Sequence, residues 1–216
     1  MPTSTELWLI RHGETVSNEN GVIQGQYDAQ LSEKGRNQAR LLAQRIALIP
    51  PNAIYSSDLS RAKDTAQIIA DVCGLPIAFD ARLREVDMGI WSNRPIEEVA
   101  HLYPSEWKRS KMGDPDLQRG GGETAIEVQK RMVEVIAEII EKHRGQITIV
   151  VSHGISIRAY LAHFLDLALA NAYRRILLSS AGITCIRPPE NGNPEKLVSL
   201  NDVCHLNVSR ANREGF

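Results

Sequence analysis

The stretch Leu7-Trp8-Leu9-Ile10-Arg11-His12-Gly13-Glu14-Thr15 decides the fold of this chain. Four apolar residues come first, and an Arg-His pair then stands directly before a glycine. A buried strand ends in this way when its last side chains face a reactant, because a glycine lets the backbone approach a bound group closely. We therefore expect a core strand that ends at a reactive site.

Other apolar runs indicate further strands. They lie at residues 53–55, 77–79, 147–151 and 183–186, with a weaker run at 196–200. Segments with helical periodicity lie at 32–49 and 58–73, and Thr124 and Glu127 form a capping-box pattern that begins another helix. Because helices repeatedly follow strands, we predict an α/β fold: a three-layer sandwich with a mostly parallel central sheet flanked by helices.

Residues 91–123 break this rhythm. They contain three prolines, two tryptophans and the run Gly120-Gly121-Gly122, with short helical patches near 95–102 and 104–111. Long irregular segments in compact domains are usually functional or disordered, and the tryptophans favour order. We predict one domain spanning residues 1–216, with a helical and loop cap insertion at about 91–123 that covers one end of the sheet.

Composition argues against several classes of protein. The 216 residues are 43% hydrophobic, and a formal net charge of −1 argues against nucleic-acid binding through a broad basic face. No apolar run approaches the roughly 20 residues that cross a bilayer, and the N-terminus lacks the pattern of a secretory signal. Three scattered cysteines argue against a disulfide framework or a zinc ribbon. We expect a cytoplasmic protein without a nucleic-acid or membrane partner.

Four separated segments carry residues suited to phosphate chemistry. They are residues 11–12, 55–62, 83–87 and 151–154, and three of them stand at the ends of predicted strands. Reactants bind outside the carboxyl ends of strands in an open parallel sheet, so the fold can gather these segments into one pocket. We also expect helices after Ser57 and Gly154 to offer free N–H donors to an anion. Together these features predict a site for a tetrahedral phosphoryl group.

The local patterns resemble those of the histidine phosphatase superfamily, the phosphoglycerate mutase-like proteins, from about residue 7 to residue 206. The most specific block is R-H-G-E-T-x-x-N at 11–18. Further matching blocks lie in order at 24–28, 31–39, 56–66, 83–91, 121–124 and 150–154. A lone R-H-G is weak support, but a series of blocks in the right order is strong, and the chain is most similar to the phosphatase branch.

This resemblance implies a role for each matching residue. His12 would attack phosphorus through one ring nitrogen while a backbone carbonyl holds the other, and Glu85 would protonate the leaving alkoxide and then activate water. No metal or other cofactor is required, because arginines neutralise the phosphoryl charge. The implied phosphate-binding residues are Arg11, Asn18, Arg61, His153 and Gly154, with Gln24, Gly25 and Asp87 behind them or near the substrate.

The reaction that the sequence favours is hydrolysis of a small phosphorylated metabolite, of the phosphoserine, ribazole phosphate or sugar phosphate type. The first alternative is a cofactor-dependent phosphoglycerate mutase. Mutases of the family usually carry a longer segment after the acid, with a Glu-Arg-His-Tyr-Gly pattern, whereas Glu85 is followed here by Val86-Asp87-Met88-Gly89. The second alternative is a non-catalytic module that binds a phosphorylated ligand. It predicts the loss of a catalytic residue, and none is lost.

We expect the cap to set substrate specificity. Taken singly, however, each charged side chain of the cap is more often a solvated surface residue than a residue that contacts substrate. The cap bases that could meet a second anionic group are Arg94, Lys108, Arg109 and Lys111, and the acids that could meet an amine are Glu97, Glu98 and Asp114.

The apolar residues at 165–169 and the weak strand at 196–200 are compatible with a homodimer, but apolar helix residues more often belong to the core.

Overall fold

Strand β1 (Glu6–Arg11) is the core strand expected from the opening sequence. The computed structural model describes residues 4–190 and 192–206. Side chains alternate along β1, so Leu7 and Leu9 join one buried cluster and Trp8 and Ile10 join another on the opposite face. A strand buried on both faces belongs in the middle of a sheet covered by helices.

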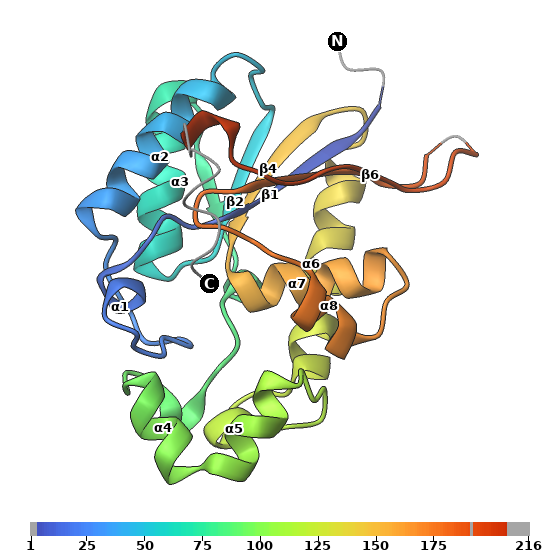
Figure 1. The fold of residues 1–216 in the computed structure, drawn as a ribbon. Coiled ribbons are helices and arrows are strands. Elements are labelled where there is room, and N and C mark those ends of the chain that lie inside the picture. The colour runs from blue at the N-terminus through green and yellow to red at the C-terminus, as the bar shows by residue number, and fades with distance from the viewer. Residues whose placement is uncertain (1–3, 191, 207–216) are drawn as a thin grey trace.

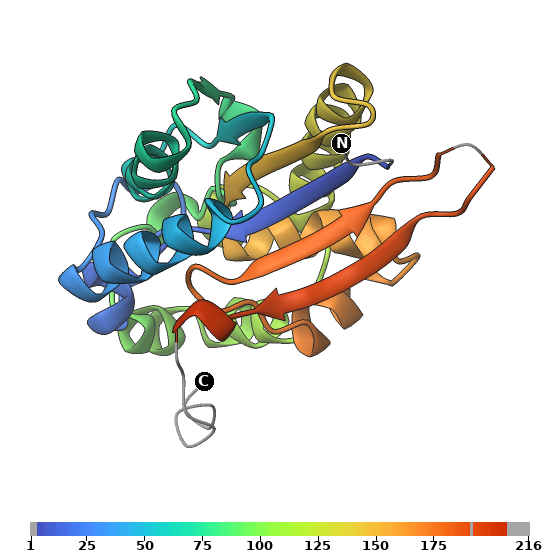
Figure 2. The same cartoon turned by 90° about the horizontal axis from the view of Figure 1, so that it is seen from above.

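Six strands form one sheet in the order β3-β2-β4-β1-β5-β6. Strands β3, β2, β4 and β1 pair in parallel, whereas β5 runs antiparallel to β1 and β6 antiparallel to β5 (Figure 2). The prediction of a mostly parallel sheet is confirmed. The remaining strands are β2 (Ala53–Ser56), β3 (Ile77–Phe79), β4 (Ile147–Ser152), β5 (Ile183–Arg187) and β6 (Lys196–Asp202).

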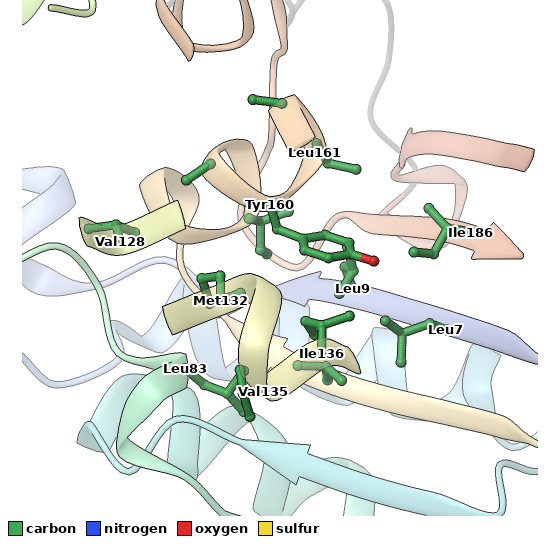
Figure 3. Close-up of a cluster of buried hydrophobic side chains, with 14 of the residues drawn as sticks. Leu7, Leu9, Leu83, Val128, Met132, Val135, Ile136, Tyr160, Leu161 and Ile186 are labelled. Carbon is green, nitrogen blue, oxygen red and sulfur yellow. The ribbon is translucent and has the colours of Figure 1, made fainter. Parts of the chain in front are cut away.

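Helices cover both faces of the sheet, which confirms the three-layer arrangement (Figure 1). On one face lie α2 (Glu33–Ile46) and α3 (Ser60–Cys73). On the other lie α6 (Ala125–Lys142) and α7 (Gly154–Phe164), with α8 (Leu169–Arg175) packed against α7. Figure 3 shows this second layer, where α6 and α7 pack on β1 through Met132, Val135, Ile136, Tyr160, Leu161, Leu7 and Leu9.

Several predicted boundaries move by a few residues. The helix predicted at 58–73 begins at Ser60, because Leu59 has extended backbone and serves as the N-cap. The helix predicted at 32–49 ends at Ile46, and residues 47–49 form a turn. The capping box of α6 is confirmed, since the Thr124 hydroxyl accepts from the Glu127 N–H and the Glu127 carboxylate accepts from the Thr124 N–H. Short α1 spans Val16–Glu19.

The two short helices α4 (Ile96–Leu102) and α5 (Pro104–Lys111) lie together beyond the sheet (Figure 1). Two 3-10 turns, Gly89–Trp91 and Arg119–Gly121, flank them, and a Cβ at Gly89 would overlap the Gly120 carbonyl. That this segment acts as a specificity cap on a single domain stays a prediction. Its own buried cluster consists of Ile23, Trp91, Val99 and Leu117. No helix in the described ranges combines the length and apolarity that a membrane span needs.

Candidate active site

His12 lies buried directly after β1. Its Nδ1 is 2.7 Å from the carbonyl oxygen of Gly13, and because a carbonyl can only accept, Nδ1 carries the proton and donates. Burial, with the charges of Arg61 and Arg11 added to it, holds the pKa of His12 well below its usual range. The ring is therefore neutral near pH 7, and Nε2 keeps a free lone pair, which is the state a nucleophile needs.

Arg61 lies in the first turn of α3 with its side chain almost fully buried. Its guanidinium donates to the carbonyl oxygens of Tyr27 (2.9 Å) and Gly25 (2.7 Å). Burial lowers the pKa of Arg61 to about 10, against the opposing effect of the Glu85 and Asp28 carboxylates. It is still charged at pH 7, and its Nε is buried without a partner among the described residues. Such a cation is available to an anion in the site.

His153 follows β4, with its ring centroid 5.1 Å from that of His12. Its Nε2 lies 2.8 Å from the hydroxyl oxygen of Ser57, which also accepts from the Leu59 N–H. The Ser57 hydroxyl can donate to Nε2 or accept from it, and in the first case the His153 proton lies on Nδ1. Burial and the positive charge of Arg61 hold the pKa of His153 well below its usual range. Its Nδ1 is buried and has no partner within the described part of the chain.

The Glu85 carboxylate binds the N-terminus of α7, which differs from what the sequence predicted. Its carboxylate accepts from the backbone N–H groups of Ile155 and Ser156, at 3.2 Å each, and from Val86 at 3.0 Å. The first turn of α7 was expected to offer these N–H groups to a phosphoryl group. They are instead bound by the proposed acid, because a helix N-terminus favours a carboxylate as well as a phosphate. This arrangement holds the Glu85 side chain at the first turn of α7.

The same correction applies to α3. The Ser60 N–H at its start donates to Asp28 at 2.8 Å, and the Ser60 hydroxyl donates to the other oxygen of that carboxylate. Helix N-termini after Ser57 and Gly154 are thus partly occupied by acidic side chains of the chain itself. A phosphoryl group in this site depends more on guanidinium and imidazole donors than the sequence suggested.

Arg11 and Gly154 meet at the end of the sheet. Arg11 donates through Nη1 to the carbonyl oxygen of Leu178 at 2.7 Å, while its Nε is buried without a partner in the described ranges. A Cβ on Gly154 would lie 3.5 Å from both Arg11 Nε and Arg158 Nη1. The small residue at 154 therefore leaves two guanidinium groups close together. Burial lowers the pKa of Arg11, and the charge of Arg158 adds to this effect.

The remaining predicted site residues have mainly local contacts. Asn18 is exposed, and its side-chain oxygen accepts from the backbone and hydroxyl of Thr15 in a capping box. The Asp87 carboxylate accepts from the Gly89 N–H at 2.8 Å, which fixes the turn after Glu85. Gly25 supplies a carbonyl to Arg61, and the buried amide oxygen of Gln24 has no partner among the residues described. Their predicted roles toward a substrate stay predictions.

Arg131 is a residue that the sequence reasoning missed. From the middle of α6 it donates to the carbonyl oxygens of Arg82, Arg84 and Glu85, and it pairs with Glu123 at 2.9 Å. It thereby ties the backbone that carries Glu85 to the helix layer. In the sequence, the only indication was an arginine within an amphipathic helix, and an arginine at such a position usually faces solvent.

The fold thus gathers two histidines of lowered pKa with the buried side chains of Arg11 and Arg61. The chain matches the histidine phosphatase superfamily (branch 1) over residues 7–203, and it belongs to that superfamily. A probable phosphoglycerate mutase of Yersinia pestis is 36% identical over 209 residues, which cover 94% of this chain and 95% of that protein.

Solved structures of similar proteins include several phosphatases. A mycobacterial glucosyl-3-phosphoglycerate phosphatase in complex with VO3 has a TM-score of 0.83 at 30% identity, covering 91% of this chain and 98% of that one. An Entamoeba histolytica phosphoserine phosphatase variant in complex with phosphoserine has a TM-score of 0.82 at 29% identity, covering 94% and 99%. Bacillus stearothermophilus YhfR has a TM-score of 0.88 at 30% identity, covering 94% and 100%.

Proposed function

We propose that this protein is a phosphomonoesterase that hydrolyses a small phosphorylated metabolite through a phosphohistidine at His12. The observation that carries the proposal is the state of the His12 ring. It is neutral, its Nδ1 proton is bound by Gly13, and its Nε2 lone pair lies among the charges of Arg61 and Arg11. We place the protein in the cytoplasm, as its sequence predicts.

In the first step, the Nε2 lone pair of His12 forms a bond to phosphorus as the phosphorus–oxygen bond to the leaving group breaks. Glu85 gives its proton to the departing oxygen, so the product leaves as an alcohol. Arg11, Arg61 and the Nδ1 proton of His153 stabilise the negative charge on the phosphoryl oxygens as the transition state forms. Guanidinium groups supply this stabilisation in the proposed mechanism, without a metal ion.

In the second step, water attacks the phosphorus of the phosphohistidine. The Glu85 carboxylate accepts a proton from that water, the nitrogen–phosphorus bond breaks, and its electron pair returns to Nε2 of His12. Inorganic phosphate leaves, and Glu85 is again protonated for the next cycle. Both proton transfers use the same carboxylate, which accepts from the α7 backbone, while Arg131 binds the backbone carbonyl of Glu85.

Phosphoglycerate mutase activity is the second candidate, because a probable mutase is 36% identical to the chain. Hydrolysis is favoured because a cofactor-dependent mutase must retain a bisphosphorylated intermediate until the second phosphoryl group returns to the histidine. The cap bases Arg94 and Arg109, which were candidates to meet a second anionic group, are paired at 2.7 Å with Glu98 and Asp114 of the cap. The phosphatase-like solved structures support the same choice.

A screen of the purified protein against a panel of phosphate esters tests this proposal. The panel contains p-nitrophenyl phosphate, phosphoserine, 3-phosphoglycerate and sugar phosphates, with His12→Ala as the blank. We expect phosphate release from at least one ester by the wild type and none by the blank. Activity retained by His12→Ala would show that the nucleophile is another residue.

A second assay separates hydrolysis from mutase activity. The protein is incubated with 3-phosphoglycerate and catalytic 2,3-bisphosphoglycerate, and the products are followed by phosphorus NMR. We expect inorganic phosphate to exceed 2-phosphoglycerate. Rapid formation of 2-phosphoglycerate without phosphate release would identify a mutase instead.

A further inference from the structure

Asn201 lies in β6, the edge strand of the sheet (Figure 2). Its φ is 50°, in the left-handed region, which asparagine adopts more readily than most residues that carry a side chain. The register between β5 and β6 shifts here, between the pairs formed by Ile183 and Cys185. A bulge of this kind re-aims one side chain and is common next to active sites. The local backbone therefore sets Asn201 apart from the regular strand.

The Asn201 side chain binds the loop formed by residues 178–182, which precedes β5. Its oxygen accepts from the Ser179 backbone N–H at 2.7 Å, and its amide donates to the Ser179 hydroxyl at 3.2 Å. The Asn201 backbone N–H donates to the buried Thr184 hydroxyl at 3.2 Å. Gly182 leaves room for this contact, since a Cβ there would lie 2.4 Å from the Asn201 side-chain oxygen. Asn201 thus ties the loop to β6.

The same loop holds the end of β1. The Leu178 carbonyl oxygen accepts from Nη1 of Arg11 at 2.7 Å. The Ala181 N–H donates to the carbonyl oxygens of Arg11 (3.0 Å) and His12 (3.2 Å), and the Gly182 carbonyl accepts from the Arg11 N–H at 3.3 Å. Ala181 has a φ of 57°, which is rare for a residue with a Cβ and persists only where the surroundings impose it. The loop is therefore held on both sides.

We propose that Asn201 is a positioning residue for the phosphoryl site, because it fixes residues 178–182 and these in turn hold the guanidinium of Arg11. The inference rests on the proposed function, in which Arg11 stabilises the charge on the phosphoryl oxygens. With Nη1 bound by Leu178, the direction of the remaining donors of Arg11 is set by the loop. A displacement of about 1 Å in such a group can lower the rate about 100-fold.

A second contact anchors β6 independently of Asn201. The Asp202 carboxylate binds the guanidinium of Arg45 on α2 and accepts from the Cys204 N–H at 3.0 Å. Loss of the Asn201 side chain therefore leaves β6 attached to the helix layer. We expect the effect of such a loss to be confined to the loop and to the Arg11 side chain that the loop holds.

The variant Asn201→Gly tests this role. Glycine adopts a positive φ without strain, so the change removes the two side-chain hydrogen bonds and leaves the backbone conformation accessible. With p-nitrophenyl phosphate, kcat should fall about 10- to 100-fold while KM changes less than about threefold, because Arg11 acts mainly on charge that develops in the transition state.

Two further variants of β6 serve as controls. Asn201→Asp can still accept from the Ser179 N–H and should retain most of the wild-type kcat. Val198→Thr changes an exposed side chain of the same strand and should leave kcat and KM unchanged. Loss of activity in Asn201→Asp equal to that in Asn201→Gly would overturn the role given to the Ser179 contact.

A double-mutant cycle with Arg11 separates positioning from a purely structural role. In an Arg11→Ala background, Asn201→Gly should lower kcat by less than about threefold, because the group that Asn201 positions is already gone. A structural role predicts the same loss in both backgrounds, and that result would overturn the proposal.

Amide hydrogen exchange tests the positioning without turnover, and it also decides if Arg11→Ala does not fold. Asn201→Gly should raise the exchange rate of the Ala181 N–H at least about tenfold more than that of Val150, which lies in the middle of β4 and reports global unfolding. Equal increases, or none, would overturn the positioning even if the wild type hydrolyses esters. Selective exchange at Ala181 in a protein that hydrolyses none would support the hold on the loop and contradict only the proposed function.

Discussion

The hydroxyl oxygen of Ser57 lies 2.8 Å from Nε2 of His153, and a hydrogen bond donated by this hydroxyl places the proton of the second histidine on Nδ1. A neutral imidazole donates from only one nitrogen at a time. With Nε2 accepting from Ser57, Nδ1 is left as the donor. A serine at the end of β2 thereby prepares a hydrogen bond that the phosphoryl group would receive at the end of β4.

Replacing Ser57 with alanine should therefore lower kcat by about tenfold with little change in KM, because a donor used in the transition state is lost. Nitrogen NMR of His153 should show the proton distributed over both ring nitrogens. Ser56→Ala is the matched control, since the equally buried Ser56 hydroxyl bonds only to the Ser57 carbonyl. An unchanged His153 tautomer in Ser57→Ala would contradict the assignment.

Replacing Glu85 with glutamine should separate the two chemical steps. The amide can still accept from the α7 backbone but can neither donate an acidic proton nor accept one from water. Turnover of alkyl phosphates should fall by roughly 10²–10⁴-fold. With p-nitrophenyl phosphate, whose leaving group needs little protonation, the phosphorylated protein should accumulate and appear by mass spectrometry one phosphoryl group heavier. The same adduct in His12→Ala would show that His12 is not the acceptor.

Stability should fall as the pH falls below about 6.5. The pKa values of His12 and His153 are lowered from an ordinary value of 6.5, so the unfolded chain binds more protons than the folded protein below that pH. Each histidine should contribute up to about 1.4 kcal/mol of unfolding free energy per pH unit. Carboxylates such as Asp58, whose pKa is lowered from 3.8, lose their contribution only at more acidic pH.

Urea unfolding between pH 5 and pH 7.5 measures this dependence. His153→Gln removes one of three histidines whose pKa is lowered, the third being His205, and should reduce the slope by roughly a third to a half. A free energy of unfolding that stays constant across the range would mean that these rings bind protons equally in both states.

Gly35 should not tolerate a side chain. A Cβ at this position would overlap the carbonyl oxygen of Glu14, and one at Gly13 would lie 2.6 Å from the Gly35 carbonyl oxygen. Gly35→Ala should cost about 1–3 kcal/mol in urea unfolding, because two stretches of backbone are forced apart. Gly154→Ala is the comparison, since its Cβ would meet only arginine side chains at 3.5 Å. Equal losses of stability in the two variants would contradict this packing.

The spacing of apolar residues predicted the strands and helices well, because each of these elements buries one regularly spaced set of side chains. The strand at 77–79 and the helix at 104–111 have the predicted bounds. The first residue of a helix was predicted less well where no side chain forms a capping hydrogen bond. Leu59 begins α3 through its extended backbone, a feature that residue type does not reveal.

The candidate site was only partly accessible from the sequence. Strand ends bring Arg11, His12 and His153 together, as the order of the motifs predicted. The expectation of free helix N-termini held only in part, because Glu85 binds two N–H groups of α7 across about 70 residues of sequence. Contacts of this kind depend on tertiary approach. The contacts of Arg131 with Glu123 and with the Glu85 backbone are similar, since Arg131 belongs to no motif that spacing could identify.

The small buried cluster of Ile23, Trp91, Val99 and Leu117 affects which parts of the sequence can vary during evolution. It gives α4 and α5 a support of their own, which meets the cluster on the α6–α7 face through the half-buried Met88. Mutations on the outward surfaces of these helices can accumulate without disturbing the strand ends that carry His12 and His153. A lineage can thus vary this segment while the residues at the strand ends are inherited intact.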